Sequence, residues 1–176
     1  MLGTVDRLWS PWRLNYVTAA GTGSGASNAH KEPACIFCEA LALDTQAPLV
    51  VHRGARAYVI LNLYPYNNGH LMIVPHRHIA QLALAEADEL NELMALTRRA
   101  EMVLTEAYAP HGLNVGVNLG RAAGAGVADH LHIHSVPRWN GDTNFMTVVS
   151  ETRVLPESLD QTAARLRPIF DRLASS

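Results

Sequence analysis

The chain has little of several residue types that would define its class. It contains 2 cysteines in 176 residues, only three positions apart, so it lacks the disulfide framework of a secreted domain. Charged residues make up 17% and the formal net charge is −2, which disfavours general binding to nucleic acid or to an anionic membrane. No stretch approaches the roughly 20 apolar residues of a membrane span. We therefore expect a soluble, cytoplasmic protein without a membrane partner.

Several catalytic signatures are also missing. No pair of carboxylates is evident, and no serine lies in a nucleophile elbow. Residues Gly120–Gly126 are small, but no Gly-Lys-Ser/Thr follows them, so they are not a Walker loop. Small residues let backbone N–H groups approach an anion closely, as in phosphate cradles. The alternative is a mobile surface loop, and the position directly before three histidines favours the cradle.

His130, His132 and His134 alternate with Leu131 and Ile133. Successive side chains of an extended strand point to opposite faces, so the imidazoles share one face while the two apolar residues anchor the other. Neighbouring histidines would lie about 6–7 Å apart and the outer two about 13 Å apart. A flat row of this length favours a reaction track, with one nucleophile and helpers, over a site in which all three histidines bind one metal.

The composition divides the chain into three parts. Residues 1–32 carry two tryptophans and a Gly/Ser/Ala-rich stretch, 19–29, and we expect a docking segment followed by a flexible linker. The compact domain is predicted for residues 33–150. A helical tail is predicted for residues 151–176.

Hydrophobic periodicity predicts an α+β domain with about five strands in a mostly antiparallel sheet, one long helix and a C-terminal helix. Residues Cys35–Cys38 are expected to form a short turn that leads into an apolar stretch through Leu43. The predicted strands are 49–52, 56–61, 70–74, 112–118 and 131–137. The long helix is predicted for 79–108, and the C-terminal helix follows residue 155.

Cys35 and Cys38 have the spacing of half a tetrahedral zinc site. Histidines elsewhere would have to supply the other half, and either His76 or His78 could turn toward the cysteines. A redox pair is an alternative, although the surroundings do not suggest the βαβ context that it requires. A pair of buried thiols is a second alternative.

The run His130–Val136 matches the histidine-triad pattern His-φ-His-φ-His-φ-φ, with Ser135 as the one polar departure. Together with Cys35–Cys38 and Gly69–Pro75, it makes the stretch 35–145 resemble the histidine-triad (HIT) nucleotide-binding family. The flanking tryptophan-rich runs look like those of a bacterial branch near the fragile-histidine-triad proteins and the diadenosine tetraphosphate phosphorylases.

The resemblance implies an enzyme that cleaves dinucleoside polyphosphates or related nucleotidyl substrates. His132 would attack the α-phosphorus and form a covalent nucleotidyl-imidazole intermediate, since a neutral imidazole is a good nucleophile. His134 would donate a hydrogen bond to the phosphate or to the leaving-group oxygen. Water, in a hydrolase, or inorganic phosphate, in a phosphorylase, would then release the nucleotide.

The resemblance also implies the residues that bind the nucleotide. Asn62 would hold the ribose, and His70 would line the same pocket. Asn118 approximates a polar residue on the phosphate side. Many hydrolases of the family carry a glutamine where this chain has Gly126, so the identity of the acceptor stays open.

Zinc-bearing members of the family use residues that correspond to Cys35, Cys38, His78 and His130. Such a zinc would be structural and would fix His130 beside the nucleophile. In the alternative arrangement, His130 only orients His132 and the cysteines are idle. The resemblance further implies a homodimer.

Two other functions stay open at this point. One is a nucleotide-binding or signalling module that keeps the triad but turns over slowly. The other is a metallohydrolase in which His130 and His132 bind a catalytic zinc.

Overall fold

The computed structural model describes residues 35–43, 47–142 and 156–175. The expected docking segment and linker in residues 1–32 lie outside the described residues, as does the domain boundary expected near residue 150. No helix in the described ranges is long and apolar enough to cross a membrane.

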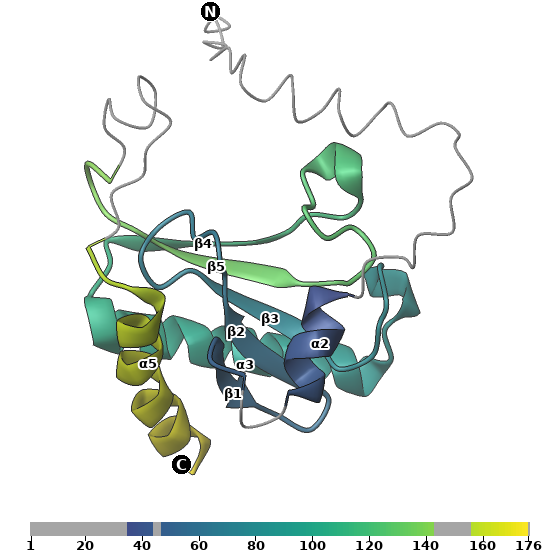
Figure 1. The fold of residues 1–176 in the computed structure, drawn as a ribbon, viewed down its shortest axis with the longest axis horizontal. Helices are drawn as coiled ribbons and strands as arrows, with labels where there is room; N and C mark the ends of the chain where they lie inside the picture. Colours follow the sequence, from purple (N-terminus) through teal and green to yellow (C-terminus); the bar gives the residue numbers. More distant parts are fainter. Residues whose placement is uncertain (1–34, 44–46, 143–155, 176) are drawn as a thin grey trace, which may run out of the picture. The chain divides into compact units, whose positions relative to one another are not determined.

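Five strands form one antiparallel sheet in the order β1-β2-β3-β5-β4 (Figure 1). The strands are β1 (Val50–Arg53), β2 (Ala57–Leu61), β3 (Leu71–Pro75), β4 (Gly112–Val117) and β5 (Ile133–Arg138). The predicted α+β class and the antiparallel sheet are confirmed. β5 lies between β3 and β4 in the sheet. His134 on β5 therefore pairs with Met72 on β3, a strand that begins directly after His70.

Helices cover both faces of the sheet. Ala57, Val59 and Leu61 of β2 pack in the core with α3 (Ala87–Tyr108) and α5 (Leu159–Ala174). Tyr58 and Ile60 belong to a second cluster with Phe37 of α2 (Ile36–Ala42). Every residue of β2 and β3 is buried, because both sides of these strands are covered.

The long helix begins later than the sequence predicts. Residues from Ile79 onward form an irregular stretch and a short 3-10 turn, η2 (Leu82–Leu84), and α3 starts at Ala87. A capping box between Glu86 and Glu89 fixes this start. The backbone carbonyl of Ile79 instead accepts the N–H of Leu131, at 2.6 Å, and so supports the histidine run.

The stretch after Cys35 is a short helix, α2, where the sequence analysis expected a turn and an apolar stretch. A helix of 7 residues is too short to be stable alone, so its stability comes from tertiary contacts. Arg53 donates hydrogen bonds to the carbonyls of Ala40 and Leu41 at its C-terminal end. The hydroxyl of Tyr58 donates to the carbonyl of Phe37, at 2.7 Å.

The predicted C-terminal helix is confirmed as α5, which begins with a capping box between Ser158 and Gln161. Arg167 of this helix donates hydrogen bonds to the carbonyls of Pro48 and Val50 at the β1 edge of the sheet. These contacts satisfy carbonyl groups that an edge strand would otherwise leave without protein partners.

An ion pair between a half-exposed arginine and a buried carboxylate joins the turn after β3 to the start of α3. Arg77 donates two hydrogen bonds to Glu89, at 2.8 and 2.7 Å, and a third to the carbonyl of Leu84. The side chain of Glu89 is 5% exposed, and Arg77 lowers its pKa to about 2 from an ordinary value of 4.5. The ion pair therefore anchors the turn that carries His76 and His78.

We expect Glu89→Gln to lower the free energy of unfolding by about 2 kcal/mol at neutral pH. The substitution removes the buried negative charge that accepts both hydrogen bonds from Arg77. The contribution of Glu89 is fully present above pH 4.5 and is lost as the pH falls toward its folded-state pKa of about 2. Urea unfolding over a series of pH values measures both effects, with the exposed Glu101→Gln as control. A stability equal to that of wild type at neutral pH would contradict this role.

Candidate active site and metal centre

Only one of the three alternating histidines lies within a strand. β5 begins directly after His132, so His134 is on the ladder, whereas His130 and His132 lie in the segment before it. The predicted strand thus begins two residues too early. The N–H of Leu131 bonds to the carbonyl of Ile79, outside the ladder. The three imidazoles meet different hydrogen-bond partners, which are the cysteines and Pro75 for His130, the carbonyl of His130 for His132, and His70 for His134.

The residues that alternate with the histidines are buried on the opposite side of the backbone. Leu131 and Ile133 are buried in the core that faces α3 and α5, as predicted. Ser135, the polar departure from the triad pattern, is also fully buried, and its hydroxyl has no hydrogen-bond partner among the described residues. The histidines are therefore carried by backbone that is packed on its far side.

Cys35, Cys38, His78 and His130 form one cluster. Their ligand atoms all lie within 4.8 Å of one another. Nδ1 of His130 is 3.3 Å from Sγ of Cys35 and 3.6 Å from Sγ of Cys38, and Nδ1 of His78 is 3.4 Å from Sγ of Cys38. Of the two histidines that flank Arg77, His78 is the one in the cluster.

The donor set of this cluster fits a metal. Two thiols and two imidazoles are a usual tetrahedral zinc set, whose ligand atoms lie about 3.5 Å apart. Nε2 of His130 donates to the carbonyl of Pro75, at 3.0 Å, which leaves the lone pair of Nδ1 facing the cysteines. Burial and the neighbouring Cys35 raise the pKa of the Cys38 thiol, so a bound cation is needed to hold both cysteines as thiolates.

His132 is held in one tautomer by the backbone. Its Nδ1 lies 2.8 Å from the carbonyl oxygen of His130, and a carbonyl only accepts, so Nδ1 carries the proton. Nε2 therefore carries the lone pair and has no partner among the described residues. The ring is 4% exposed and lies against Phe37 and His134, with centroids 5.1 and 4.8 Å away.

His70 sets the tautomer of His134. The backbone N–H of Tyr66 donates to Nδ1 of His70, at 3.1 Å, and the side-chain amide of Asn62 lies 3.3 Å from the same atom. Nε2 of His70 consequently carries the proton and donates to Nδ1 of His134, at 2.9 Å. His134 then carries its own proton on Nε2 and can donate it to a substrate oxygen.

The electrostatics keep the catalytic candidates neutral. Burial lowers the pKa of His132. Burial, with repulsion from His132 when that ring is protonated, lowers the pKa of His134 to about 4. Burial also lowers the pKa of His130. At neutral pH the site thus combines one imidazole lone pair with one neighbouring N–H donor, which is the pair that nucleophilic attack on phosphorus requires.

The remaining predicted residues surround this pair less closely. Asn62 shapes the loop before His70, since its Oδ1 accepts the N–H of Tyr64 at 2.9 Å. Asn118 is half-buried just after β4, and its amide is 4.0 Å from where a Cβ on Gly124 would lie. Gly126 is exposed. Among the described residues, no side-chain hydrogen bond joins Asn118 to the histidines.

The Gly120–Gly126 loop contains a short 3-10 turn, η3 (Arg121–Ala123). Gly120 and Gly124 have φ values of +79° and +91°, a backbone conformation that side chains disfavour. The backbone conformation therefore accounts for two of the three glycines of the loop, independently of any bound phosphate.

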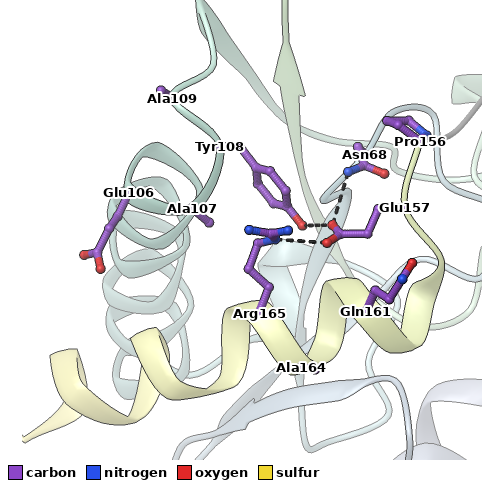
Figure 2. Close-up of a pocket in the computed structure, with 10 residues that line it drawn as sticks. All are labelled: Asn68, Glu106, Ala107, Tyr108, Ala109, Pro156, Glu157, Gln161, Ala164 and Arg165. Atoms are coloured by element: carbon purple, nitrogen blue, oxygen red, sulfur yellow. Dashed lines mark hydrogen bonds and ion pairs between the residues drawn. The ribbon is translucent and has the colours of Figure 1, made fainter.

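A separate groove of about 840 Å³ lies between the end of α3 and the start of α5. Figure 2 shows Tyr108, Asn68 and Arg165 converging on Glu157, which accepts hydrogen bonds from them at 2.5, 3.3 and 2.9 Å. None of the described residues that line this groove is a histidine. Its central carboxylate is already paired, so the groove does not compete with the histidine site as a reaction centre.

The sequence analysis missed residues that support the site. Phe37 contacts His132, and Tyr58 and Arg53 hold the helix that carries Phe37. Tyr66 supplies the N–H that orients His70. Phe37 could have been noticed because it lies between the two cysteines, whereas the other three are signalled only by their tertiary contacts.

Comparison with known proteins supports the resemblance found in the sequence. Residues 46–141 match the family model of the HIT domain. A curated relative, the AP-4-A phosphorylase of Mycobacterium tuberculosis, is 46% identical over 158 residues, which cover 90% of this chain and 80% of the relative.

Two solved structures are similar to this one. A Zn-bound histidine triad family protein from Mycobacterium smegmatis is 27% identical, with a TM-score of 0.65 over 81% of this chain and 96% of its own. A histidine triad nucleotide-binding protein from Sulfolobus tokodaii has the same identity and TM-score over 79% of this chain and 93% of its own.

We expect nitrogen-15 NMR of the imidazoles at neutral pH to find His132 protonated on Nδ1 and His134 protonated on Nε2, because the hydrogen bonds above fix both. Acidification should leave His134 neutral until the pH nears 4. The variant His70→Phe removes the donor to His134 and should release its tautomer. A wild-type His134 protonated on Nδ1 would refute the proposed hydrogen-bond chain.

Proposed function

Because the chain belongs to the HIT domain family, we propose that it is an enzyme that cleaves dinucleoside polyphosphates of the diadenosine tetraphosphate type, through a covalent intermediate on His132. The observation that carries the proposal is the hydrogen bond from Nδ1 of His132 to the carbonyl of His130. With the proton on Nδ1, the lone pair lies on Nε2 and points away from the backbone. Nε2 can therefore attack without first losing a proton. The name of the M. tuberculosis relative supports the substrate class.

The reaction follows from the two tautomers. Nε2 of His132 forms a bond to the α-phosphorus as the bond from this phosphorus to the bridging oxygen breaks, and the nucleoside polyphosphate leaves. Nε2–H of His134 donates a hydrogen bond to the oxygen on which negative charge develops. An acceptor then attacks the phosphorus from the opposite side and releases His132 as a neutral imidazole.

We assign inorganic phosphate as this acceptor, so that cleavage of diadenosine tetraphosphate yields ATP and ADP. The relative named as a phosphorylase supports this choice over water. Gly126 stands where many hydrolases of the family have glutamine, so this position brings no side chain to the reaction. In this proposal, Asn62 and His70 line the ribose side of the nucleotide, and Asn118 and Gly126 line the phosphate side.

Zinc is the metal that best suits the cluster of Cys35, Cys38, His78 and His130. When bound, it would supply structural cross-linking. Four protein ligands fill a tetrahedral shell and leave no open position for substrate, so a catalytic zinc bound by His132 is disfavoured. Nδ1 of His132 also donates its proton to the carbonyl of His130, so this nitrogen has no lone pair for a metal. The homodimer implied by the resemblance stays a prediction.

We expect His132→Asn to lose cleavage of diadenosine tetraphosphate by more than about 1000-fold, because asparagine cannot form the covalent intermediate. Substrate affinity should change little. If the protein is instead a slow-turnover nucleotide-binding module, both its affinity for the nucleotide and its cleavage rate should change little in His132→Asn. For the acceptor, the wild-type enzyme should give ADP only with phosphate present, and AMP formed equally with and without phosphate would contradict phosphorolysis.

For the metal, we expect one zinc per chain in the purified protein. Cobalt(II) should give the visible absorption band of a tetrahedral thiolate site. His78→Gln should weaken metal binding by more than about 100-fold, because a ligand is lost. His76→Gln is the matched control on the other side of Arg77 and should keep the band. Equal loss in both variants would argue against His78 as a ligand.

A further inference from the structure

Phe37 lies between the two cysteines in the chain and between two histidines in space. Its side chain is 2% exposed. The ring meets His130 edge-on, with centroids 5.4 Å apart, and lies 5.1 Å from His132 at an interplanar angle of 43°. The same residue therefore contacts a member of the metal cluster and the proposed nucleophile.

The contacts of His132 show what Phe37 contributes. The hydrogen bond from Nδ1 to the carbonyl of His130 fixes one edge of the ring, at 2.8 Å. His134 packs against the ring in a T-shaped arrangement, with centroids 4.8 Å apart. A single hydrogen bond leaves the imidazole free to tilt about it, and Phe37 with His134 opposes that tilt by van der Waals contact.

Phe37 is itself held by the frame of the metal cluster. It is the residue before Cys38 and two after Cys35, so the position of both ligands sets its backbone. Its carbonyl accepts the hydroxyl of the buried Tyr58, at 2.7 Å. Arg53 adds two hydrogen bonds to the other end of α2. A displacement of the cysteines therefore displaces the Phe37 ring.

We propose that Phe37 is a positioning residue that ties the orientation of His132 to the cluster of Cys35, Cys38, His78 and His130. The proposal rests on the function of His132 as nucleophile. Loss of metal from the cluster would then slow attack on phosphorus while the nucleotide still binds. A shift of the reacting atom by about 1 Å can cost on the order of 100-fold in rate.

The competing explanation is that Phe37 only fills the core. It belongs to an apolar cluster with Tyr58, Ile60, Met72 and Val74. A residue that only fills the core would lower stability when truncated, without a separate effect on the rate of the bound complex. The two roles are distinguished by comparing Phe37 with another buried member of the same cluster.

The test compares Phe37→Leu, Phe37→Tyr and Ile60→Val in the metal-loaded full chain. Phe37→Leu should lower kcat by about 10-fold or more, with KM within about twofold of wild type and the cobalt(II) band retained. Phe37→Tyr keeps the ring and should restore kcat. Ile60→Val, a stability control in the same cluster, should leave kcat unchanged. A wild-type kcat in Phe37→Leu would overturn the proposal.

Two further measurements separate coupling from local damage. Nitrogen-15 NMR should show the Nδ1–H signal of His132 broadened in Phe37→Leu and sharp in Ile60→Val. Chelation of the metal should lower kcat in wild type. It should lower kcat little further in Phe37→Leu, because the contact that couples the cluster to His132 is already lost in that variant. An equal factor in both proteins would overturn the coupling.

The outcome for His132 keeps this inference distinct from the proposed function. If His132→Asn retains cleavage, the proposed function itself fails, whatever the Phe37 variants do. If His132→Asn is inactive and Phe37→Leu behaves as wild type, only the role of Phe37 fails.

Discussion

The hydrogen bond from Nδ1 of His132 to the carbonyl of His130 is the constraint on which the site depends. It decides which nitrogen of His132 holds the lone pair, and thereby where the phosphorus atom of the proposed substrate would lie. The carbonyl can do this only because His130 is itself fixed at both nitrogens, by the carbonyl of Pro75 and by the cysteine cluster. The proposed nucleophile is thus oriented by the backbone of His130, whose own side chain belongs to the group of four possible metal ligands.

The histidines fall into two groups with opposite chemical requirements. His78 and His130 face thiols in a group of four ligands, which suits a closed structural metal site. His132 and His134 keep one ring nitrogen each without a partner among the described residues, which suits a reacting substrate. Phe37 lies between the groups, packed on a ring of each. Burial lowers the pKa of His130, His132 and His134, and so favours in these three the neutral imidazole that metal binding and nucleophilic attack both need.

Much of the fold could be predicted from periodicity, since strands and long amphipathic helices are signalled by local pattern. The errors occur where a tertiary contact overrides that pattern. Ile79 fits the helical spacing, yet its carbonyl is used by Leu131, so α3 begins later. The segment after Cys35 becomes a helix because Arg53 and Tyr58 satisfy its carbonyls. Neither contact has a signature in the sequence near the residues that it changes.

The sequence by itself determined the family, the three histidines and the two cysteines, because these rest on residue type and spacing. It left open which histidine completes the cluster. Only the tertiary structure decided for His78, whose Nδ1 lies 3.4 Å from Sγ of Cys38. His76, directly after β3, instead donates its backbone N–H to the carbonyl of Arg56, and its ring packs near Tyr58. Tautomers were decided there too, since a hydrogen-bond partner brought from another element determines which nitrogen holds a proton.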